Sequence, residues 1–597
     1  MPENWLPKLI IILSIASCGV AVLWQQPPLV AAGETLGLDP GGNASPSMPT
    51  PQPITRTVSG VVEDAQGPVA GAIVRVQATD NYTMTTQDGA FTLSGLMATR
   101  PVTVTAWAKG YYNGWTQVGP GAMPITITLK PHYTIDNPDY GWYVFEGVEG
   151  SASCGLCHTA NAEWEADAHA QAAVNPRFLT MYAGTDVDGN KTPSIRRDSL
   201  GKPLPPDLTQ PYYGPGFRLD YPDRTGNCAA CHTPLASKLE PTNTCGWSGC
   251  HSSTTAALSE EVPSGVSPLY LTGHAAEGIT CEFCHKIGEV FLTPETGLPH
   301  PDQPGITSMR LYRPNEGDDL FFGTFDDVTR PADSYLPLLE ESAFCAPCHY
   351  GIFDGVAGDM TVADGVVIYN SFGEWLNSPY SDPETGQTCQ ECHMPSVDYE
   401  YFVFPERGGL PRDPKRIHNH KMLGATDEIL LQNSVTMTTT VQLEGDQVLV
   451  EVSLTNDKTG HHVPTDSPLR HLILVVQATD AASKTLQLRA GPQLPDWTGN
   501  YADQPGQVYA QILEDEWTGE SPTGAFWRPI RVVGDTRLAA MATDVSRYTF
   551  AAPGNGPTTI EARLIYRRAF QQLMEWKGWT DPDIVMETET VAVAGRE

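Results

Sequence analysis

The feature that most constrains this chain of 597 residues is its thirteen cysteines. Apart from Cys18 they form six pairs, and a histidine directly follows the second cysteine of every pair. Five pairs have the spacing C-x-x-C-H, whereas the sixth has four residues between its cysteines. The six motifs are Cys154, Cys157 and His158; Cys228, Cys231 and His232; Cys245, Cys250 and His251; Cys281, Cys284 and His285; Cys345, Cys348 and His349; and Cys389, Cys392 and His393.

This spacing is typical of covalent haem attachment. Two thiols on one short turn can add to the two vinyl groups of one porphyrin, and the next histidine then becomes the proximal iron ligand. A disulfide framework would not place a histidine after each pair. Zinc also binds C-x-x-C pairs, and Cys228, Cys231, Cys245 and Cys250 could form a four-thiolate site. The sequence therefore predicts six haem c groups, with the zinc alternative open for the longer Cys245–His251 loop.

The region that carries the motifs, predicted as a hexahaem cytochrome c domain over 140–432, is rich in proline and glycine and has little apolar periodicity. Such a region cannot build a conventional core, so the porphyrins must supply most of its buried apolar area. We expect short helices that carry the motifs, joined by irregular loops.

The net charge is −34, from 36 Lys and Arg against 70 Asp and Glu. A surface this acidic repels phosphate backbones, which excludes nucleic-acid binding. It predicts basic docking faces on any redox partner protein.

The N-terminal segment predicts export. Leu9 to Trp24 form a sixteen-residue apolar run, which is short for a membrane span. With Val30-Ala31-Ala32 as a cleavage site, residues 1–32 are a signal peptide or a membrane anchor. A lipoprotein signal ending at Cys18 is a third interpretation. Residues 33–55 form a Pro/Gly-rich linker, and the mature chain is expected at the periplasmic or extracellular face.

Two regions alternate polar and apolar residues as strands do. Residues 56–131 predict a small antiparallel β-sandwich. Their string GVVEDAQGPVAGAIVRV…TTQDGAFTLSGL resembles the carboxypeptidase regulatory-like (transthyretin-like) domain, which implies a structural module without catalysis. Residues 433–597 predict a C-terminal β-rich domain, again a sandwich, in which Leu564 to Trp576 run from a strand into a helix. The chain has no glycine-rich phosphate loop, nucleophile elbow or H-E-x-x-H motif.

Nine further histidines could supply distal iron ligands. The segments CGLCHTANAEWEADAHA, GHAAEGITCEFCH, RIHNHKMLGA and NDKTGHHVPTDSPLR resemble, in this order, multihaem cytochromes related to hydroxylamine oxidoreductase and its tetrahaem electron acceptor. The resemblance covers about 140–597. The distal ligands that it implies are His169, His274, His418, His420 and either His461 or His462.

The remaining histidines are weaker candidates. His132, after the first sandwich, is an open case, whereas His300 in a proline-rich loop and His471 on a predicted strand are expected not to bind iron. His461 and His462 are adjacent, so on extended backbone they face opposite ways and only one reaches a given iron.

One departure from the pattern concerns Tyr380. Glu374-Trp375 repeats Glu163-Trp164, but the position equivalent to His169 is Tyr380. One haem could therefore take its ligand from elsewhere, accept Tyr380 or stay five-coordinate. An ordinary packed aromatic is the favoured interpretation of Tyr380.

These features predict an electron-transfer protein with no catalytic residues. Two axial imidazoles give low-spin iron without an open position, which favours electron transfer over substrate binding. The alternative is a multihaem oxidoreductase acting on a small nitrogen or sulfur compound at one five-coordinate haem, although the C-x-x-C-K motif of nitrite reductases is missing. The flanking sandwiches could tether the chain, dock partners or build a homopolymer.

Overall fold

The computed structural model describes residues 55–121, 124–137, 139–193, 195–222, 226, 228–234, 267–301, 303–315, 317–353 and 365–595. All of them belong to the unit Ile54–Glu597. The predicted segment 1–32, with Cys18, nearly all of the linker and the sixth motif Cys245–His251 lie outside the described residues. Within the described ranges, no helix is long and apolar enough to cross a membrane.

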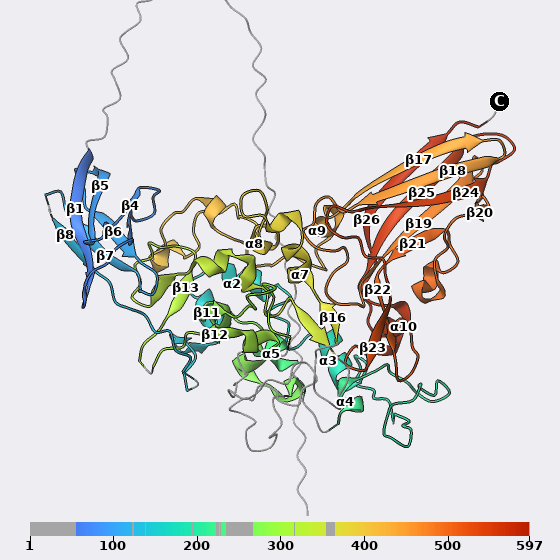
Figure 1. Cartoon of the computed structure of the whole chain (residues 1–597), viewed down its shortest axis with the longest axis horizontal. Coiled ribbons are helices and arrows are strands. Elements are labelled where there is room, and N and C mark those ends of the chain that lie inside the picture. Colours follow the sequence, from blue (N-terminus) through green and yellow to red (C-terminus); the bar gives the residue numbers. More distant parts are fainter. Residues whose placement is uncertain are drawn as a thin grey trace, which may run out of the picture. The chain divides into compact units, whose positions relative to one another are not determined.

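The first described region is a β-sandwich (Figure 1). One sheet has the order β2-β1-β5 with β8 also paired to β1, and the other has the order β4-β3-β6-β7. Val58 and Val62 of β1 are buried against Val74, Phe91 and Val104 between the sheets. The strands are β1 Thr55–Asp64, β2 Gly67–Pro68, β3 Ile73–Val76, β4 Tyr82–Met84, β5 Ala90–Met97, β6 Val102–Trp107, β7 Gly114–Val118 and β8 Ile125–Thr128.

The predicted sandwich is confirmed, but it is not wholly antiparallel. β8 pairs with β1 in parallel. The reason is that β8 follows β7 of the other sheet, so a crossover and not a hairpin sets its direction.

The central region consists of short helices, single 3-10 turns and two-stranded sheets, as expected from its proline and glycine content. The longest helix in the described part of this region, α3, has eight residues. The elements are β9 Val144–Phe145, β10 Val148–Glu149, α1 Ser151–Gly155, α2 Ala160–Glu165, α3 Pro176–Ala183, α4 Phe217–Asp220, α5 Ala229–His232, η4 Pro268–Tyr270, η5 Gly273–Ala276, α6 Cys281–Cys284, β11 Ile287–Val290, η6 Gly305–Ser308, β12 Met309–Leu311, β13 Phe321–Gly323, β14 Asp333–Tyr335, η7 Pro337–Glu340, η8 Ser342–Phe344, β15 Gly351–Phe353, β16 Val366–Tyr369, α7 Ser371–Leu376, η9 Pro379–Ser381, α8 Cys389–His393, η10 Pro405–Arg407, η11 Pro414–Arg416 and α9 Glu428–Gln432.

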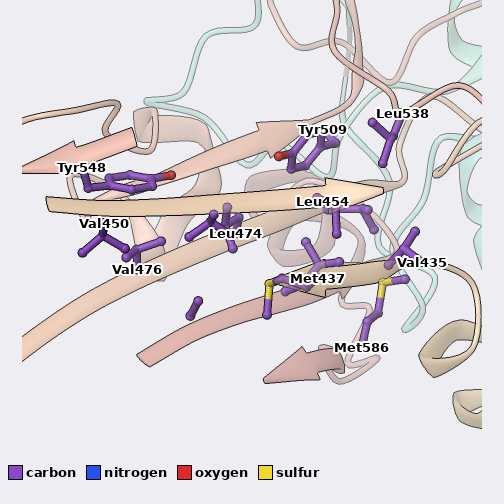
Figure 2. Close-up of a cluster of buried hydrophobic side chains, with 14 of the residues drawn as sticks. Val435, Met437, Val450, Leu454, Leu474, Val476, Tyr509, Leu538, Tyr548 and Met586 are labelled. Atoms are coloured by element: carbon purple, nitrogen blue, oxygen red, sulfur yellow. The ribbon is translucent and has the colours of Figure 1, made fainter. Parts of the chain in front are cut away.

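The C-terminal region is a second β-sandwich, with sheets ordered β17-β18-β24-β20 and β21-β19-β25-β26. Alternate residues of β18 are buried, and Figure 2 shows Val450 and Leu454 packed with Leu474 and Val476 of β19. The elements are β17 Thr436–Glu444, β18 Gln447–Thr455, β19 His471–Asp480, β20 Leu488–Ala490, η12 Asp496–Tyr501, β21 Gly506–Tyr509, β22 Gln511–Asp515, β23 Ile530–Asp535, β24 Thr543–Ala551, β25 Thr558–Arg567, α10 Gln571–Lys577 and β26 Ile584–Val593.

β19 is buried on both faces because a second apolar cluster covers its outer side. Ile473 and Val475 pack there against Leu494 and Val508. The predicted passage from strand to helix is confirmed, since β25 ends at Arg567 and α10 begins at Gln571.

Candidate functional site

Each described cysteine motif forms a single helical turn. In four of them the histidine N–H donates to the carbonyl of the first cysteine, at 2.9 to 3.1 Å, and the fifth motif is helix α8. The ten cysteines of these motifs form no disulfide. Each turn therefore presents two free thiols and an imidazole within five residues, the set that covalent haem attachment requires.

Four of the five described motif imidazoles have Nδ1 within hydrogen-bond distance of an acceptor. His232, His285 and His393 donate from Nδ1 to the carbonyls of Ala172, Phe322 and Leu423, at 2.9, 2.5 and 2.5 Å. His349 Nδ1 lies 3.2 Å from Asp466 Oδ2. A neutral imidazole that donates from Nδ1 keeps an unprotonated Nε2, which is the atom that binds a metal.

Three motif histidines each face a second histidine ring. Two metal–nitrogen bonds of about 2 Å, each extended by roughly 1 Å from nitrogen to ring centre, place ring centroids about 6 Å apart across one metal ion. The observed centroid distances and interplanar angles are 6.4 Å and 19° for His285 and His420, 6.1 Å and 13° for His393 and His461, and 6.2 Å and 57° for His349 and His169. The residues present therefore fit haem iron held by two imidazoles.

The second histidine of each pair is oriented in the same manner. His420 Nδ1 donates to the His418 carbonyl and His461 Nδ1 to the His462 carbonyl, both at 2.9 Å. His169 Nδ1 lies 2.7 Å from Asp167 Oδ1. All six paired rings thus have Nδ1 occupied, which leaves Nε2 for a metal.

Burial keeps three of these imidazoles neutral. It lowers the pKa of His393 and His420 to about 4 and also lowers the pKa of His285. At His349 burial opposes protonation as well, but the hydrogen bond and charge of Asp466 outweigh it and raise the pKa to about 9.

Neighbouring motifs touch through their thiols. Side-chain hydrogen bonds join Cys154 to Cys281 and Cys231 to Cys348. A third joins Cys345 to Cys389. The Cys345–His349 motif therefore contacts two other motifs, so porphyrins attached there would be neighbours.

The two Glu-Trp segments belong to two copies of one local arrangement. Trp164 Nε1 donates to the Ile279 carbonyl at 2.7 Å, and Trp375 Nε1 to the Gln387 carbonyl at 2.8 Å. Both acceptors stand two residues before the first cysteine of a motif. The predicted parallel between Glu163-Trp164 and Glu374-Trp375 is thus a structural one.

Sequence reasoning missed the serines of this repeat. Ser151 Oγ accepts from the Cys281 N–H at 3.3 Å, and Ser342 Oγ accepts from the Cys389 N–H at 2.9 Å. Each serine stands three residues before the first cysteine of a different motif, Ser151 before Cys154 and Ser342 before Cys345. This shared spacing is the signal that could have found them.

The glutamates of the repeat hold the segments that carry the facing histidines. Glu163 accepts from the His420 N–H at 2.8 Å, and Glu374 accepts from the His462 N–H at 3.1 Å. His462 Nδ1 also lies 2.6 Å from Glu374 Oε1. Of the adjacent histidines, the structure therefore pairs His461 with His393 and places His462 against Glu374.

Tyr380 is a packed aromatic. Its hydroxyl donates to the Asp457 carbonyl at 3.2 Å. Gly460 lies against it, and a Cβ there would come within 3.0 Å of the Tyr380 Cβ. The histidine that faces His393 is His461, so it comes from outside the Glu-Trp segment.

The other candidate histidines have different surroundings. His418 Nδ1 donates to the Met394 carbonyl at 2.9 Å, and the His132 ring lies among Tyr112, Tyr312 and Phe322. His274 lies in η5, and His300 is exposed in a loop. His471 is fully buried at the start of β19 and stacks on Phe570, so it is a core residue.

Two motif histidines have no such ring partner among the described side chains. His158 stacks beside Phe402 and His232 stacks on Phe178. In the same described set, no group of three or more His, Cys, Asp and Glu side chains is arranged to hold a metal ion.

Comparison with known proteins identifies one domain. Residues 57–130 match the carboxypeptidase regulatory-like domain, which confirms the N-terminal resemblance. No curated protein matches the chain.

Two solved structures are similar to parts of the chain. A penta-haem cytochrome c552 from Thermochromatium tepidum is 20% identical with a TM-score of 0.48, over 74% of this chain and 99% of that chain. A type II Cohesin-X-Dockerin complex from Acetivibrio cellulolyticus is 18% identical with a TM-score of 0.12, over 16% of this chain and 64% of that chain. Both are too distant for their function to be transferred.

Proposed function

We propose that this chain is an exported hexahaem c-type cytochrome that passes electrons along closely packed haems, most of them bound by two histidines. The observation that carries the proposal is the set of three histidine ring pairs with centroids 6.1 to 6.4 Å apart. Each pair joins a C-x-x-C-H histidine to a histidine from another segment. Bound haem iron would supply the one-electron chemistry, and the protein its attachment, ligands and dielectric.

The pairs favour electron transfer over catalysis. At the motifs that begin at Cys281, Cys345 and Cys389, the paired imidazoles would hold haem iron with two nitrogen ligands, which would leave no coordination site for a substrate. The thiol contacts between motifs support electron passage between haems, because they bring attachment points together in two groups: the motifs of Cys154 and Cys281, and the motifs of Cys231, Cys345 and Cys389.

Export and partners belong to the same proposal. The apolar segment Leu9–Trp24 supports export, with a cleaved signal or a retained membrane anchor. The charge of −34 supports docking to a basic redox protein, between a membrane or periplasmic donor and another partner or external acceptor. The two sandwiches would tether the haem region or dock partners.

Haem stoichiometry tests the proposal first. Protein made in a host that matures c-type cytochromes should carry six covalent haems, measured by mass spectrometry and the pyridine haemochrome spectrum. Five haems would remove the Cys245–His251 assignment, and colourless protein would overturn the proposal.

Electron paramagnetic resonance separates the two functions. If the protein only transfers electrons, its oxidised form should show low-spin ferric signals that nitrite and hydroxylamine leave unchanged. A high-spin signal that responds to either compound would instead favour an oxidoreductase acting at a five-coordinate haem.

A further inference from the structure

One of the three histidine pairs has carboxylates behind both of its rings. Asp167 Oδ1 accepts from His169 Nδ1 at 2.7 Å and from the His169 backbone N–H at 2.8 Å. On the other side of the pair, Asp466 Oδ2 lies 3.2 Å from His349 Nδ1. No other described pair has this arrangement, since the Nδ1 atoms of the other paired histidines all contact neutral groups.

None of the four other paired rings has a carboxylate at Nδ1. Their Nδ1 atoms donate to backbone carbonyls, at distances of 2.5 to 2.9 Å. These acceptors are the carbonyls of Phe322, Leu423, His418 and His462.

Both carboxylates are well placed to act on their rings. The side chains of Asp167 and Asp466 are only 5% and 13% exposed, so water screens their charge little. The second oxygen of Asp466 accepts from the backbone N–H groups of Asn370 and Ser371, at 3.3 and 3.0 Å. The carboxylate is thereby held in position behind His349.

A carboxylate that accepts the Nδ1 proton makes the imidazole a stronger donor at Nε2. A stronger donor stabilises ferric over ferrous iron and lowers the reduction potential. A backbone carbonyl is neutral, so it strengthens the imidazole as a donor less and lowers the reduction potential less.

We propose, on the basis of the proposed function, that Asp167 and Asp466 give the haem at Cys345 and Cys348 the lowest potential of the three haems with paired histidines. This haem is then the last of the three to be reduced. Because its motif contacts that of Cys389, an electron that passes from the Cys389 haem to this haem makes an uphill step. The two aspartates are positioning residues that act through His169 and His349.

The variant Asp167→Asn isolates the charge. One amide oxygen can accept both hydrogen bonds that Asp167 Oδ1 now accepts, so the position of His169 is kept. In a spectroelectrochemical titration of the holoprotein, one low-potential component should move upward by about tenfold in its reduction equilibrium, which is about 59 mV for a one-electron couple.

Asp466→Asn is the second variant, and asparagine tolerates the positive φ of 58° at this position. It should move the same component in the same direction. The matched control is Asp427→Asn, which removes an equal charge from the cap of α9, where Asp427 accepts from the Leu430 N–H and asparagine caps equally well. The control should leave every potential unchanged.

Haem content and the low-spin signals are measured on every variant. Retained haem and low-spin iron with no component shifted in either Asn variant would overturn this inference and leave the electron-transfer proposal standing. An equal shift in the control would overturn it too. Wild-type protein without covalent haem would instead remove the proposed function on which it rests.

Discussion

At the scale of single residues, hydrogen bonds at Nδ1 decide what each histidine can do. The adjacent His461 and His462 show this clearly. His461 donates to a backbone carbonyl and faces His393, whereas His462 lies against the buried Glu374. The two residues are of the same type, and only His461 is placed with its ring opposite a motif histidine.

Replacing His461 should therefore remove one iron ligand and leave one haem five-coordinate. His461→Ala should convert one low-spin ferric signal to a high-spin signal, because the ring opposite His393 is lost. Electron paramagnetic resonance of the oxidised holoprotein measures this. His462→Ala is the matched control and should keep the low-spin signal, and the reverse result would show that the wrong histidine has been paired.

A second residue-scale prediction concerns Glu520. Burial raises its pKa to about 7, with Arg528 acting against the shift and Asp515 adding to it. The unfolded value is near 4.5, so the folded state holds the proton more tightly and stability falls as pH rises between about 4.5 and 7.

Glu520→Gln removes this penalty. We expect the variant to exceed the native chain in free energy of unfolding by roughly 1 to 3 kcal/mol at pH 8 and to equal it at pH 4. Urea unfolding followed by circular dichroism at both pH values measures the difference. A gain of the same size at pH 4 would rule out titration as its cause.

At the scale of elements, short capped turns replace long helices. Thr280 and Thr388 stand directly before the first cysteines of two motifs and cap α6 and α8. At α8 the cap is reciprocal, because Glu391 Oε2 accepts from the Thr388 N–H at 2.7 Å. Such caps stabilise a turn that is too short to be stable on its own propensity.

The α8 cap can be tested by substitution. Thr388→Ala should cost about 1 kcal/mol of stability, while Thr388→Ser, which keeps the hydroxyl, should cost little. Thermal unfolding of the holoprotein measures both. Equal loss in the two variants would assign the effect to the threonine methyl group.

At the scale of the whole molecule, buried ion pairs join segments that are far apart in sequence. Arg528 donates to Asp220 of α4 at 2.8 and 3.0 Å and to Asp515 of β22 at 2.7 Å. All three side chains are at most 4% exposed. This network links the motif-bearing region to the C-terminal sheets.

Breaking the network should be costly. Arg528→Ala leaves two buried carboxylates without their cation, so we expect a loss of about 3 to 5 kcal/mol. Arg528→Lys should recover only part of it, because an ammonium cannot bond both carboxylates through a planar fork. Urea unfolding measures the stability of both variants, which should fall in the order native, Arg528→Lys, Arg528→Ala. An alanine variant as stable as the native chain would contradict the prediction.

The net charge gives a prediction about partners. If a basic redox protein docks on this acidic surface, the association rate should fall steeply as ionic strength rises toward 1 M, because screening shortens the range of attraction. Stopped-flow electron transfer with a basic and an acidic small cytochrome measures the effect. Equal salt dependence for both would contradict charge-guided docking.

Much of the architecture could be predicted from local pattern. Alternation along Val448–Leu454 predicts β18 because every second side chain meets the core. The parallel β1–β8 pair could not be predicted, since it depends on where a crossover returns the chain.

By itself the sequence predicted where haem would attach, because thioether formation needs two thiols and an imidazole within a few consecutive residues. Only the tertiary structure decided which histidines face each other. His420 lies far from the His285 motif in sequence, and Glu163 accepts a hydrogen bond from the His420 backbone N–H and so holds the segment that faces His285. The tertiary structure also decided which rings have a carboxylate behind them. Attachment is local chemistry, whereas ligand pairing depends on the packing of distant segments.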